Sequence, residues 1–361
     1  MTELMKQEEK AVFSLRALYQ QFGYSQFKMS KFESYDLYMQ NKDFLVSDGI
    51  ITFTDTDGTL MALKPDVTLS IVKNYRGDQL PLQKVYYNEN VYRISGASHS
   101  YREIMQTGLE CIGDVGIYDI CEVILLAAKS LHAISERFVL DISQMQIIWD
   151  AIHACGLPYN DQAAVLTAIG DKNEDALCAY PLLQKLVKTS GLLKDVLPVL
   201  REFCTTDAAK AASRQLEIIA IILDQNGLSD YVQLDFSIVN DMNYYNGIVF
   251  RGYIEGIPNS VLSGGQYDKL MEKMGKNTGG IGFAVYLDQL SLLDTHQKKY
   301  DVDIVLLYAD DSDIPALSRK ADELTANGGT VLLLKKLPEV LRYGRLLRYE
   351  NGRLRELENN G

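Results

Sequence analysis

A carboxamide and a carboxylate side chain stand four residues apart on one predicted strand, with a glycine midway between them. Residues 83–113 alternate apolar and polar side chains around a turn rich in serine and glycine, which is typical of a β-hairpin. Because successive strand side chains point to opposite faces, Gln106, Gly108 and Glu110 share a face, and the glycine leaves a gap for a ligand. Arg93, just before the turn, can bind a carboxylate or phosphate. We expect a small polar ligand here, with a solvated sheet face as the alternative.

The composition describes an ordinary globular protein without a general affinity for polyanions. The 361 residues are 47% hydrophobic, enough for a large core and two or three domains. The net charge of -12 disfavours nucleic acid and anionic membranes. Five cysteines without a CxxC pair and four histidines without ligand spacing predict neither disulfides nor a metal, and no cofactor is indicated. The charged N-terminus and the absence of a long apolar run predict no signal peptide and no membrane span, so we expect a cytoplasmic protein.

Strands and helices alternate along the chain and must position the hairpin. Apolar residues at helical spacing predict a first helix over residues 3–22. Further patterns predict strands at 51–53, 60–63 and 138–142, and helices through Tyr75 and over 120–131. From about residue 144 to 225 the periodicity is helical almost throughout, with turns at 156–158, 170–171 and 190–191, which predicts a helical insertion.

Strand character returns after the insertion. Strands are predicted at 232–238 and 245–253. A glycine-rich segment at 263–268 then leads into a helix, and a second glycine-rich segment follows at 279–284. A charged linker at 296–300 precedes a strand, a helix and a strand at 302–308, 314–326 and 330–334. We therefore predict two domains, residues 1–295 with the helical insertion, and a small α/β tail of residues 301–361.

Five stretches resemble, in order, the catalytic domain of histidyl-tRNA synthetase, a class II aminoacyl-tRNA synthetase, over about residues 1–295. They are residues 54–68, the hairpin with Arg93 at the motif 2 arginine, Asn-Asp-Met-Asn-Tyr-Tyr at 240–245, Gly-Gly-Gln-Tyr-Asp at 264–268, and residues 282–289 at motif 3. The resemblance implies an α+β fold with a class II synthetase-like antiparallel sheet flanked by helices. It also implies a homodimer through the motif 1 region, about residues 52–75.

Two cations that synthetases use on ATP are missing here. Asn240 and Gln289 stand where the resemblance implies arginines for the α-phosphate and the triphosphate, and Ser95 replaces a motif 2 glutamate. Losing one such preorganised group typically costs ~100-fold or more in rate, so amino-acid activation is expected to be lost and no catalytic residue is assigned. The polar groups around an amino acid survive, with an aspartate in place of one glutamate. The implied histidine-like pocket comprises Asp66, Thr68, Arg93, Gln106, Glu110, Tyr244, Tyr245 and Tyr267.

The tail departs from the synthetases as well, because it is shorter than their anticodon-binding domain. Its basic residues at 335–355 are diluted by glutamates, which favours a solvated or partner-facing helix over an RNA site. A synthetase-like body without activation residues resembles the regulatory subunits of ATP phosphoribosyltransferase. That resemblance implies a non-catalytic partner of the short-form catalytic subunit in the first step of histidine biosynthesis, in a complex regulated by L-histidine. A divergent histidyl-tRNA synthetase and a histidine- or tRNA-binding module remain the alternatives.

Overall fold

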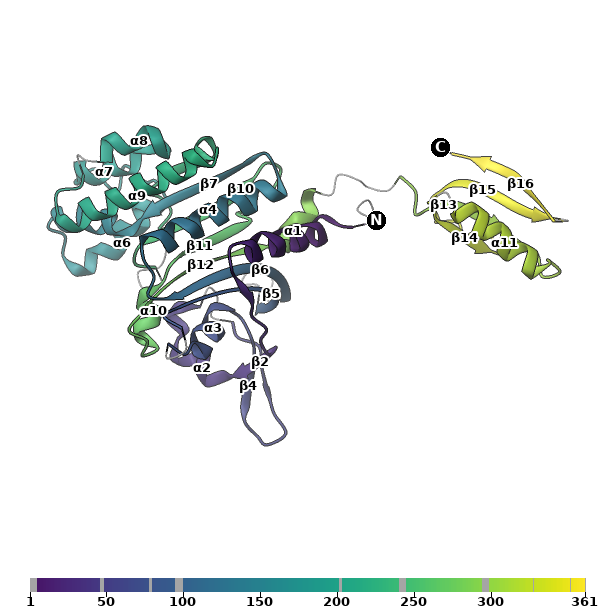
Figure 1. Cartoon of the computed structure of the whole chain (residues 1–361), viewed down its shortest axis with the longest axis horizontal. Helices are drawn as coiled ribbons and strands as arrows, with labels where there is room; N and C mark the ends of the chain where they lie inside the picture. The colour runs from purple at the N-terminus through teal and green to yellow at the C-terminus, as the bar shows by residue number, and fades with distance from the viewer. Residues whose placement is uncertain are drawn as a thin grey trace. The chain divides into compact units, whose positions relative to one another are not determined.

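The structure is a computed structural model that describes residues 5–45, 49–77, 80–94, 100–200, 203–239, 245–293, 299–326, 328–350 and 352–360. The chain divides into two compact units, Met1–Leu293 and Asp294–Gly361. The second unit is drawn in yellow-green and yellow in Figure 1.

A nine-stranded sheet, counted over the described residues, forms the centre of the first unit (Figure 1). Its order is β1-β5-β6-β12-β11-β10-β7-β9-β8, and its pairs are antiparallel except β1 with β5 and β7 with β9. The strands are β1 Ser25–Gln26, β5 Leu82–Ile94, β6 Tyr101–Gly113, β7 Phe138–Gln144, β8 Ser190–Leu192, β9 Val232–Asp235, β10 Ile248–Ile254, β11 Leu262–Gln266 and β12 Gly279–Tyr286. The predicted hairpin is confirmed, because β5 and β6 pair along their whole length, from Leu82 opposite Gly113 to Ile94 opposite Tyr101.

Helices cover one face of this sheet. Helix α4 is apolar on nearly all sides and lies across β7, β10 and β12, and α1 packs beside it. The Tyr19 hydroxyl of α1 and the Ser130 hydroxyl of α4 share a buried 3.1 Å hydrogen bond. The helices of this layer and of the insertion are α1 Gln7–Gln21, α4 Ile117–Ile134, α5 Met145–Ala154, α6 Tyr159–Gly170, α7 Pro181–Lys188, α8 Leu193–Leu200 and α9 Asp207–Gln225, with 3-10 turns η3 Ser229–Tyr231 and η4 Leu287–Leu293. In the described residues, no helix is long and apolar enough to cross a membrane.

The opposite face of β5 and β6 carries a second core. Along β5, Tyr86 packs with the helical layer, whereas Val85 and Tyr87 pack on the other side with Leu69 and Leu270. This alternation follows from the period of two in a strand. The second core includes α2 Tyr35–Gln40, η2 Lys42–Phe44, α3 Thr68–Asn74, α10 Asp268–Lys273, and a three-stranded sheet of order β2-β4-β3, with β2 Phe32–Ser34, β3 Thr52–Thr54 and β4 Leu60–Leu63.

One turn predicted inside the insertion is instead a strand. Ser190–Leu192 forms β8, which pairs antiparallel with β9 and so covers the outer edge of the sheet. The Ser-Gly pair favours a turn when it is considered alone. In the strand, Gly191 keeps a positive φ of 140°, which a glycine adopts easily. The unpaired backbone groups of β9 supply the hydrogen bonds that make this short segment extended.

The second unit is a four-stranded sheet with order β14-β13-β15-β16 among the described residues. Its elements are β13 Val302–Leu307, α11 Ile314–Thr325, β14 Val331–Leu334, β15 Tyr343–Glu350 and β16 Arg353–Asn359. The helix predicted for the basic segment is wrong, because this segment forms the β15–β16 hairpin. Leu346 and Leu347 are buried on opposite sides of the sheet, and Arg345 forms an ion pair with Glu356 across the hairpin. These cross-strand contacts outweigh the local helical preference of the charged residues.

Candidate ligand-binding site

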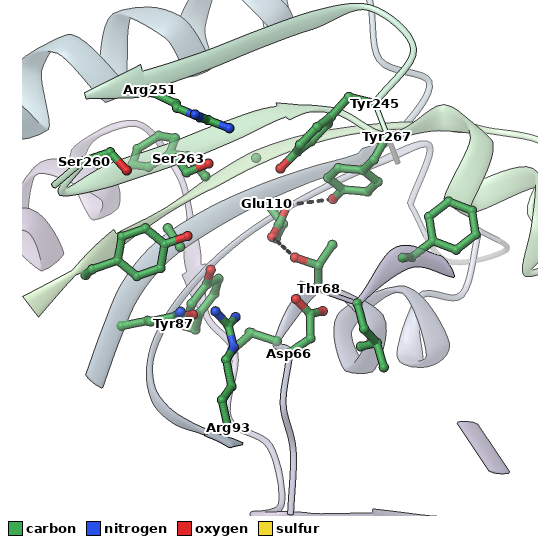
Figure 2. Close-up of a pocket in the computed structure, with 18 of the residues that line it drawn as sticks. Asp66, Thr68, Tyr87, Arg93, Glu110, Tyr245, Arg251, Ser260, Ser263 and Tyr267 are labelled. Atoms are coloured by element: carbon green, nitrogen blue, oxygen red, sulfur yellow. Dashed lines mark hydrogen bonds between the residues drawn. The ribbon is translucent and has the colours of Figure 1, made fainter. Parts of the chain in front are cut away.

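The predicted site residues surround one cavity on the second-core face of the β5–β6 hairpin (Figure 2). Its volume of about 380 Å³ is at the lower end of the range for small-molecule sites. The predicted residues that line it are Asp66, Thr68, Arg93, Gln106, Glu110, Tyr245 and Tyr267. The remaining predicted residue, Tyr244, lies outside the described residues, as do Asn240 and Ser95.

Glu110 is the buried acid of this cavity, with 2% of its surface exposed. The Thr68 hydroxyl donates a 2.7 Å hydrogen bond to Oε1, and the Tyr267 hydroxyl donates a 2.6 Å hydrogen bond to Oε2 (Figure 2). Burial raises the pKa of Glu110 to about 8, although the two hydroxyl groups lower it, while the nearby Asp66 charge raises it. Glu110 is therefore a carboxyl group that keeps its proton at neutral pH and that a cationic partner would ionise.

Two glycines make room for this acid and for a tyrosine ring. Gly282 of β12 lies directly opposite Glu110, and a Cβ at this position would be 1.8 Å from Glu110 Oε2. Gly265 of β11 lies opposite Gly282, and a Cβ there would be 2.6 Å from the ring of Tyr245. The glycine-rich segment at 263–268, expected only to lead into a helix, thus contains strand β11, whose missing side chains leave space for the site.

Gly108 does not provide the ligand gap that its position suggested. Tyr87 pairs directly with Gly108 across the hairpin, and the Tyr87 hydroxyl lies 2.6 Å from the place that a Cβ of Gly108 would occupy. The Phe283 carbonyl oxygen is 2.2 Å from the same place. The expectation was wrong because a cross-strand neighbour fills the space, and Tyr87 itself lines the cavity.

Asp66 and Arg93 form another side of the cavity. Asp66 Oδ1 accepts a 2.9 Å hydrogen bond from the backbone N–H of Leu69. Burial raises the pKa of Asp66, and the Leu69 hydrogen bond and the Arg93 charge lower it. Arg93 Nε donates a 3.0 Å hydrogen bond to the Pro65 carbonyl oxygen, which fixes the guanidinium beside Asp66 and Tyr87 (Figure 2).

A buried ion pair holds the segment that supplies Asp66 and Thr68. The Lys64 side chain is 1% exposed and pairs with Glu89 of β5. The Lys64 carbonyl oxygen also accepts a 2.9 Å hydrogen bond from the Tyr92 N–H. Because removing one member of a buried pair typically costs about 3–5 kcal/mol, this connection between β4 and α3 is firmly fixed on the hairpin.

Sequence reasoning missed the wall contributed by β10, β11 and β12. This wall is lined by Arg251 of β10, Ser263 of β11 and Tyr286 of β12, together with Ser260, which precedes β11. Arg251 lies directly opposite Ser263 in the sheet, and its side chain points into the cavity in Figure 2. A signal was present, because Arg251 is the one charged residue within the apolar strand Ile248–Ile254. A half-buried arginine in such a strand indicates a specific partner or function.

Gln289, which stands at the predicted position of the triphosphate-binding cation, does not line the cavity. It lies in η4, and its amide donates a 3.3 Å hydrogen bond to the adjacent Asp288. Within the described part of the chain, no three His, Cys, Asp or Glu side chains are grouped so that they could hold a metal ion.

Solved structures share this arrangement of sheet, hairpin and flanking helices. The crystal structure of an ATP phosphoribosyltransferase regulatory subunit/histidyl-tRNA synthetase from Bacillus halodurans has a TM-score of 0.76 and 22% identity, covering 95% of this chain and 93% of that one. A chain of the ATP phosphoribosyl transferase (HisG:HisZ) complex from Thermotoga maritima has a TM-score of 0.62 and 20% identity, covering 78% and 97%. The fold is that of a class II aminoacyl-tRNA synthetase-like protein, which confirms the predicted fold class.

The family follows from the sequence comparison. The family model for histidyl-tRNA synthetase matches residues 2–290, and the chain therefore belongs to the histidyl-tRNA synthetase family. A curated relative from Bacillus mycoides, named ATP phosphoribosyltransferase regulatory subunit, is 28% identical over 324 residues, which cover 83% of this chain and 76% of the relative.

Proposed function

We propose that this chain is the non-catalytic regulatory subunit of ATP phosphoribosyltransferase and acts with a short-form catalytic subunit in the first step of L-histidine biosynthesis. The name of the Bacillus mycoides relative and the likeness to a chain of the HisG:HisZ complex support this proposal. The observation that carries it is that the polar residues for a small ligand are kept while a cation for ATP is lost. The cavity keeps the buried acid and hydroxyl groups for a small polar ligand, whereas the motif 3 position holds Gln289, a neutral residue outside the cavity.

L-Histidine is the ligand that we assign to the cavity. Glu110 would bind the imidazole, because this buried carboxyl group is held by Thr68 and Tyr267 and can share a proton with a weak base. Asp66, on the neighbouring wall, would bind the α-ammonium group. Gln106 and Tyr245 line the same space and can complete the hydrogen bonds of a buried polar ligand.

The regulatory role is tested by reconstitution with the short-form catalytic subunit. We expect a complex in which phosphoribosyltransferase activity depends on this chain and is inhibited by histidine. Glu110→Gln and Tyr267→Phe should weaken the inhibition by about tenfold or more, because each alters a charge-assisted hydrogen bond. Tyr343→Phe is a matched control, since its hydroxyl is bound to Glu358 in the second unit. Unchanged inhibition in both cavity variants would show that the regulatory site lies elsewhere.

An active histidyl-tRNA synthetase is the second candidate, supported by the family match over residues 2–290. It is distinguished by exchange of pyrophosphate into ATP in the presence of histidine. We expect no exchange above background, because Asn240 and Gln289 replace the two cations implied for ATP. Histidine-dependent exchange would instead establish the synthetase and contradict the non-catalytic assignment.

We also propose a homodimer through the three-stranded sheet. Phe32 and Phe53 are exposed there and contact each other edge to face, with ring centroids 5.2 Å apart. Such an apolar group on a projecting sheet fits a self-complementary contact with a second copy. The predicted interface helix is not available for it, because residues 68–72 of α3 are buried in the core of the same chain.

A cytoplasmic location is part of the same proposal. The five cysteines are free thiols, and three of them are buried. Free thiols persist in a reducing compartment, whereas an oxidising one favours disulfides.

A further inference from the structure

The cavity has a cationic side that faces its acidic side across the sheet. Glu110 lies on β6 and Arg251 on β10, with β12 and β11 between them. Three strand spacings of about 4.8 Å separate β6 from β10, so the two backbones are roughly 14 Å apart. Both side chains line the same cavity, whose volume of about 380 Å³ has room for one small molecule.

The floor between the two sides consists of small residues. Gly282 lies opposite Glu110, and on the adjacent row Ala284 lies opposite Ser263, which in turn lies opposite Arg251. All of these residues line the cavity. A ligand that rests on this floor can therefore contact Glu110 at one end and Arg251 at the other.

Both guanidinium groups of the cavity act on the same buried hydroxyl group. Burial raises the pKa of Tyr286, and the charges of Arg93 and Arg251 both lower it. Tyr286 lines the cavity on the same face of β12 as Gly282 and Ala284, because it follows them at intervals of two residues. Arg93 and Arg251 thus approach one region of the cavity from different strands, and Ser260 and Ser263 add hydroxyl donors there. Two guanidinium groups with hydroxyl donors are a suitable environment for an anion.

We infer that Arg251 binds the carboxylate of an amino-acid ligand whose imidazole is bound by Glu110, so that the cavity selects a free amino acid over its decarboxylated or reduced forms. This inference rests on the proposed histidine pocket and deepens it. It also replaces a lost charge, since the sequence has Asn240 where the family resemblance implies an arginine. In this assignment Arg251 on β10 supplies the positive charge for the ligand, although Asn240 is neutral.

The test compares three ligands that differ only at the carboxylate. L-Histidine, histidinol, which has an alcohol there, and histamine, which lacks the group, are titrated into the full chain by calorimetry. Wild type is expected to bind histidine about tenfold or more tightly than the other two, the effect of one charge-assisted hydrogen bond. Arg251→Gln should lower histidine affinity by a similar factor and leave histidinol and histamine unchanged. Arg251→Lys should retain part of the preference, because it keeps the charge.

Arg137→Gln is the matched control, because it removes an exposed arginine that pairs with Glu255 and does not line the cavity. It should bind all three ligands as wild type does. Thermal unfolding of each variant checks that the fold is intact. If Arg251 serves only to offset Asp141, which lies opposite it on β7, Arg251→Gln will keep the wild-type ligand preference, and the inference is overturned.

The outcomes separate the inference from the proposal beneath it. If wild type binds histidine but Arg251→Gln leaves the preference unchanged, the carboxylate assignment alone fails. If wild type binds none of the three ligands, the histidine pocket fails as well. Inorganic phosphate is also tested as a competitor of histidine. If it displaces histidine at concentrations below that of histidine, the Arg251 side of the cavity binds phosphate, and the carboxylate assignment is overturned.

Discussion

Tyr267 and Glu110 are 157 positions apart in the chain, and the Tyr267 hydroxyl donates a 2.6 Å hydrogen bond to Glu110 Oε2. Thr68 reaches the other oxygen from a third segment. The three segments meet because β12 lies between β6 and β11, and α3 packs on the same face. A single buried carboxyl group therefore depends on segments far apart in the chain for its position and its ionisation.

Stability should depend on pH through Glu110. Its pKa rises from 4.5 to about 8 in the folded chain. Its contribution to the free energy of unfolding is therefore fully present below pH 4.5 and is lost as pH rises to about 8, because folding then requires a buried negative charge. Each pKa unit corresponds to about 1.4 kcal/mol, so several kcal/mol are at stake.

Denaturant unfolding of wild type and Glu110→Gln from pH 5 to pH 9 measures this contribution. The glutamine variant should lose less stability over that range, and the difference between the two curves should level off above pH 8. Parallel curves for the two proteins would contradict the raised pKa of Glu110.

Proton uptake should accompany histidine binding at alkaline pH. At pH 7 Glu110 already carries a proton, which can pass to the imidazole, so binding requires almost no proton exchange with solvent. At pH 8.5 Glu110 is mostly ionised and imidazole is neutral, so the bound pair must take up most of one proton. Calorimetry in two buffers with different ionisation heats measures this number.

Glu110→Gln is the control for proton uptake and should remove the difference between pH 7 and pH 8.5. Proton release at pH 7 would contradict our assignment, since it would mean that Glu110 meets the α-ammonium group, which is already protonated at that pH.

A methyl group at position 282 should destabilise the first unit. The added Cβ of Gly282→Ala would lie 1.8 Å from Glu110 Oε2 and 2.4 Å from the Leu109 carbonyl oxygen. Because neither buried neighbour can move freely, we expect a loss of about 2 kcal/mol or more in the free energy of unfolding. Gly116→Ala is the control, with its nearest atom 3.7 Å away, and should cost under about 1 kcal/mol. Equal effects of the two substitutions would refute this packing argument.

An acidic group on the three-stranded sheet should weaken the proposed dimer. Phe53→Asp places a charge in the contact between two copies, and we expect the dimer dissociation constant to rise roughly 30-fold or more. Sedimentation velocity at micromolar concentration measures it. Phe13→Asp, at an exposed phenylalanine on α1, should leave the dimer intact. A monomeric wild type, or dissociation by Phe13→Asp alone, would contradict the assigned surface.

The sequence predicted the hairpin because its signal is local, and it predicted the cavity by combining that signal with the family resemblance. Gln106 and Glu110 share a face by strand periodicity alone, and the resemblance supplied the distant Thr68 and Tyr267. The position of Tyr87 over Gly108 could not be predicted in the same way, since it depends on the register between β5 and β6. Arg251 was missed because its partners lie on neighbouring strands rather than nearby in the sequence.

In the tail, the local sequence signal was misleading. Its charged residues favour a solvated helix when they are considered one segment at a time. In the structure, Leu346 and Leu347 fill cores on both sides of the sheet and Gly352 adopts a φ of 74° in the turn of the hairpin. These tertiary contacts, and not the charge pattern, decide the secondary structure.

The buried pair of Lys64 and Glu89 has a mechanical consequence. Strand β4 begins at the exposed Leu60, and only eight residues further along Thr68 contacts Glu110 inside the cavity. The pair clamps this short length of backbone to the hairpin, so no loose linker separates its two ends. A ligand that moves Thr68 would therefore also move the end of β4. A partner bound to β4 would affect the cavity in return, and the coupling free energy between the two binding events is the same in both directions.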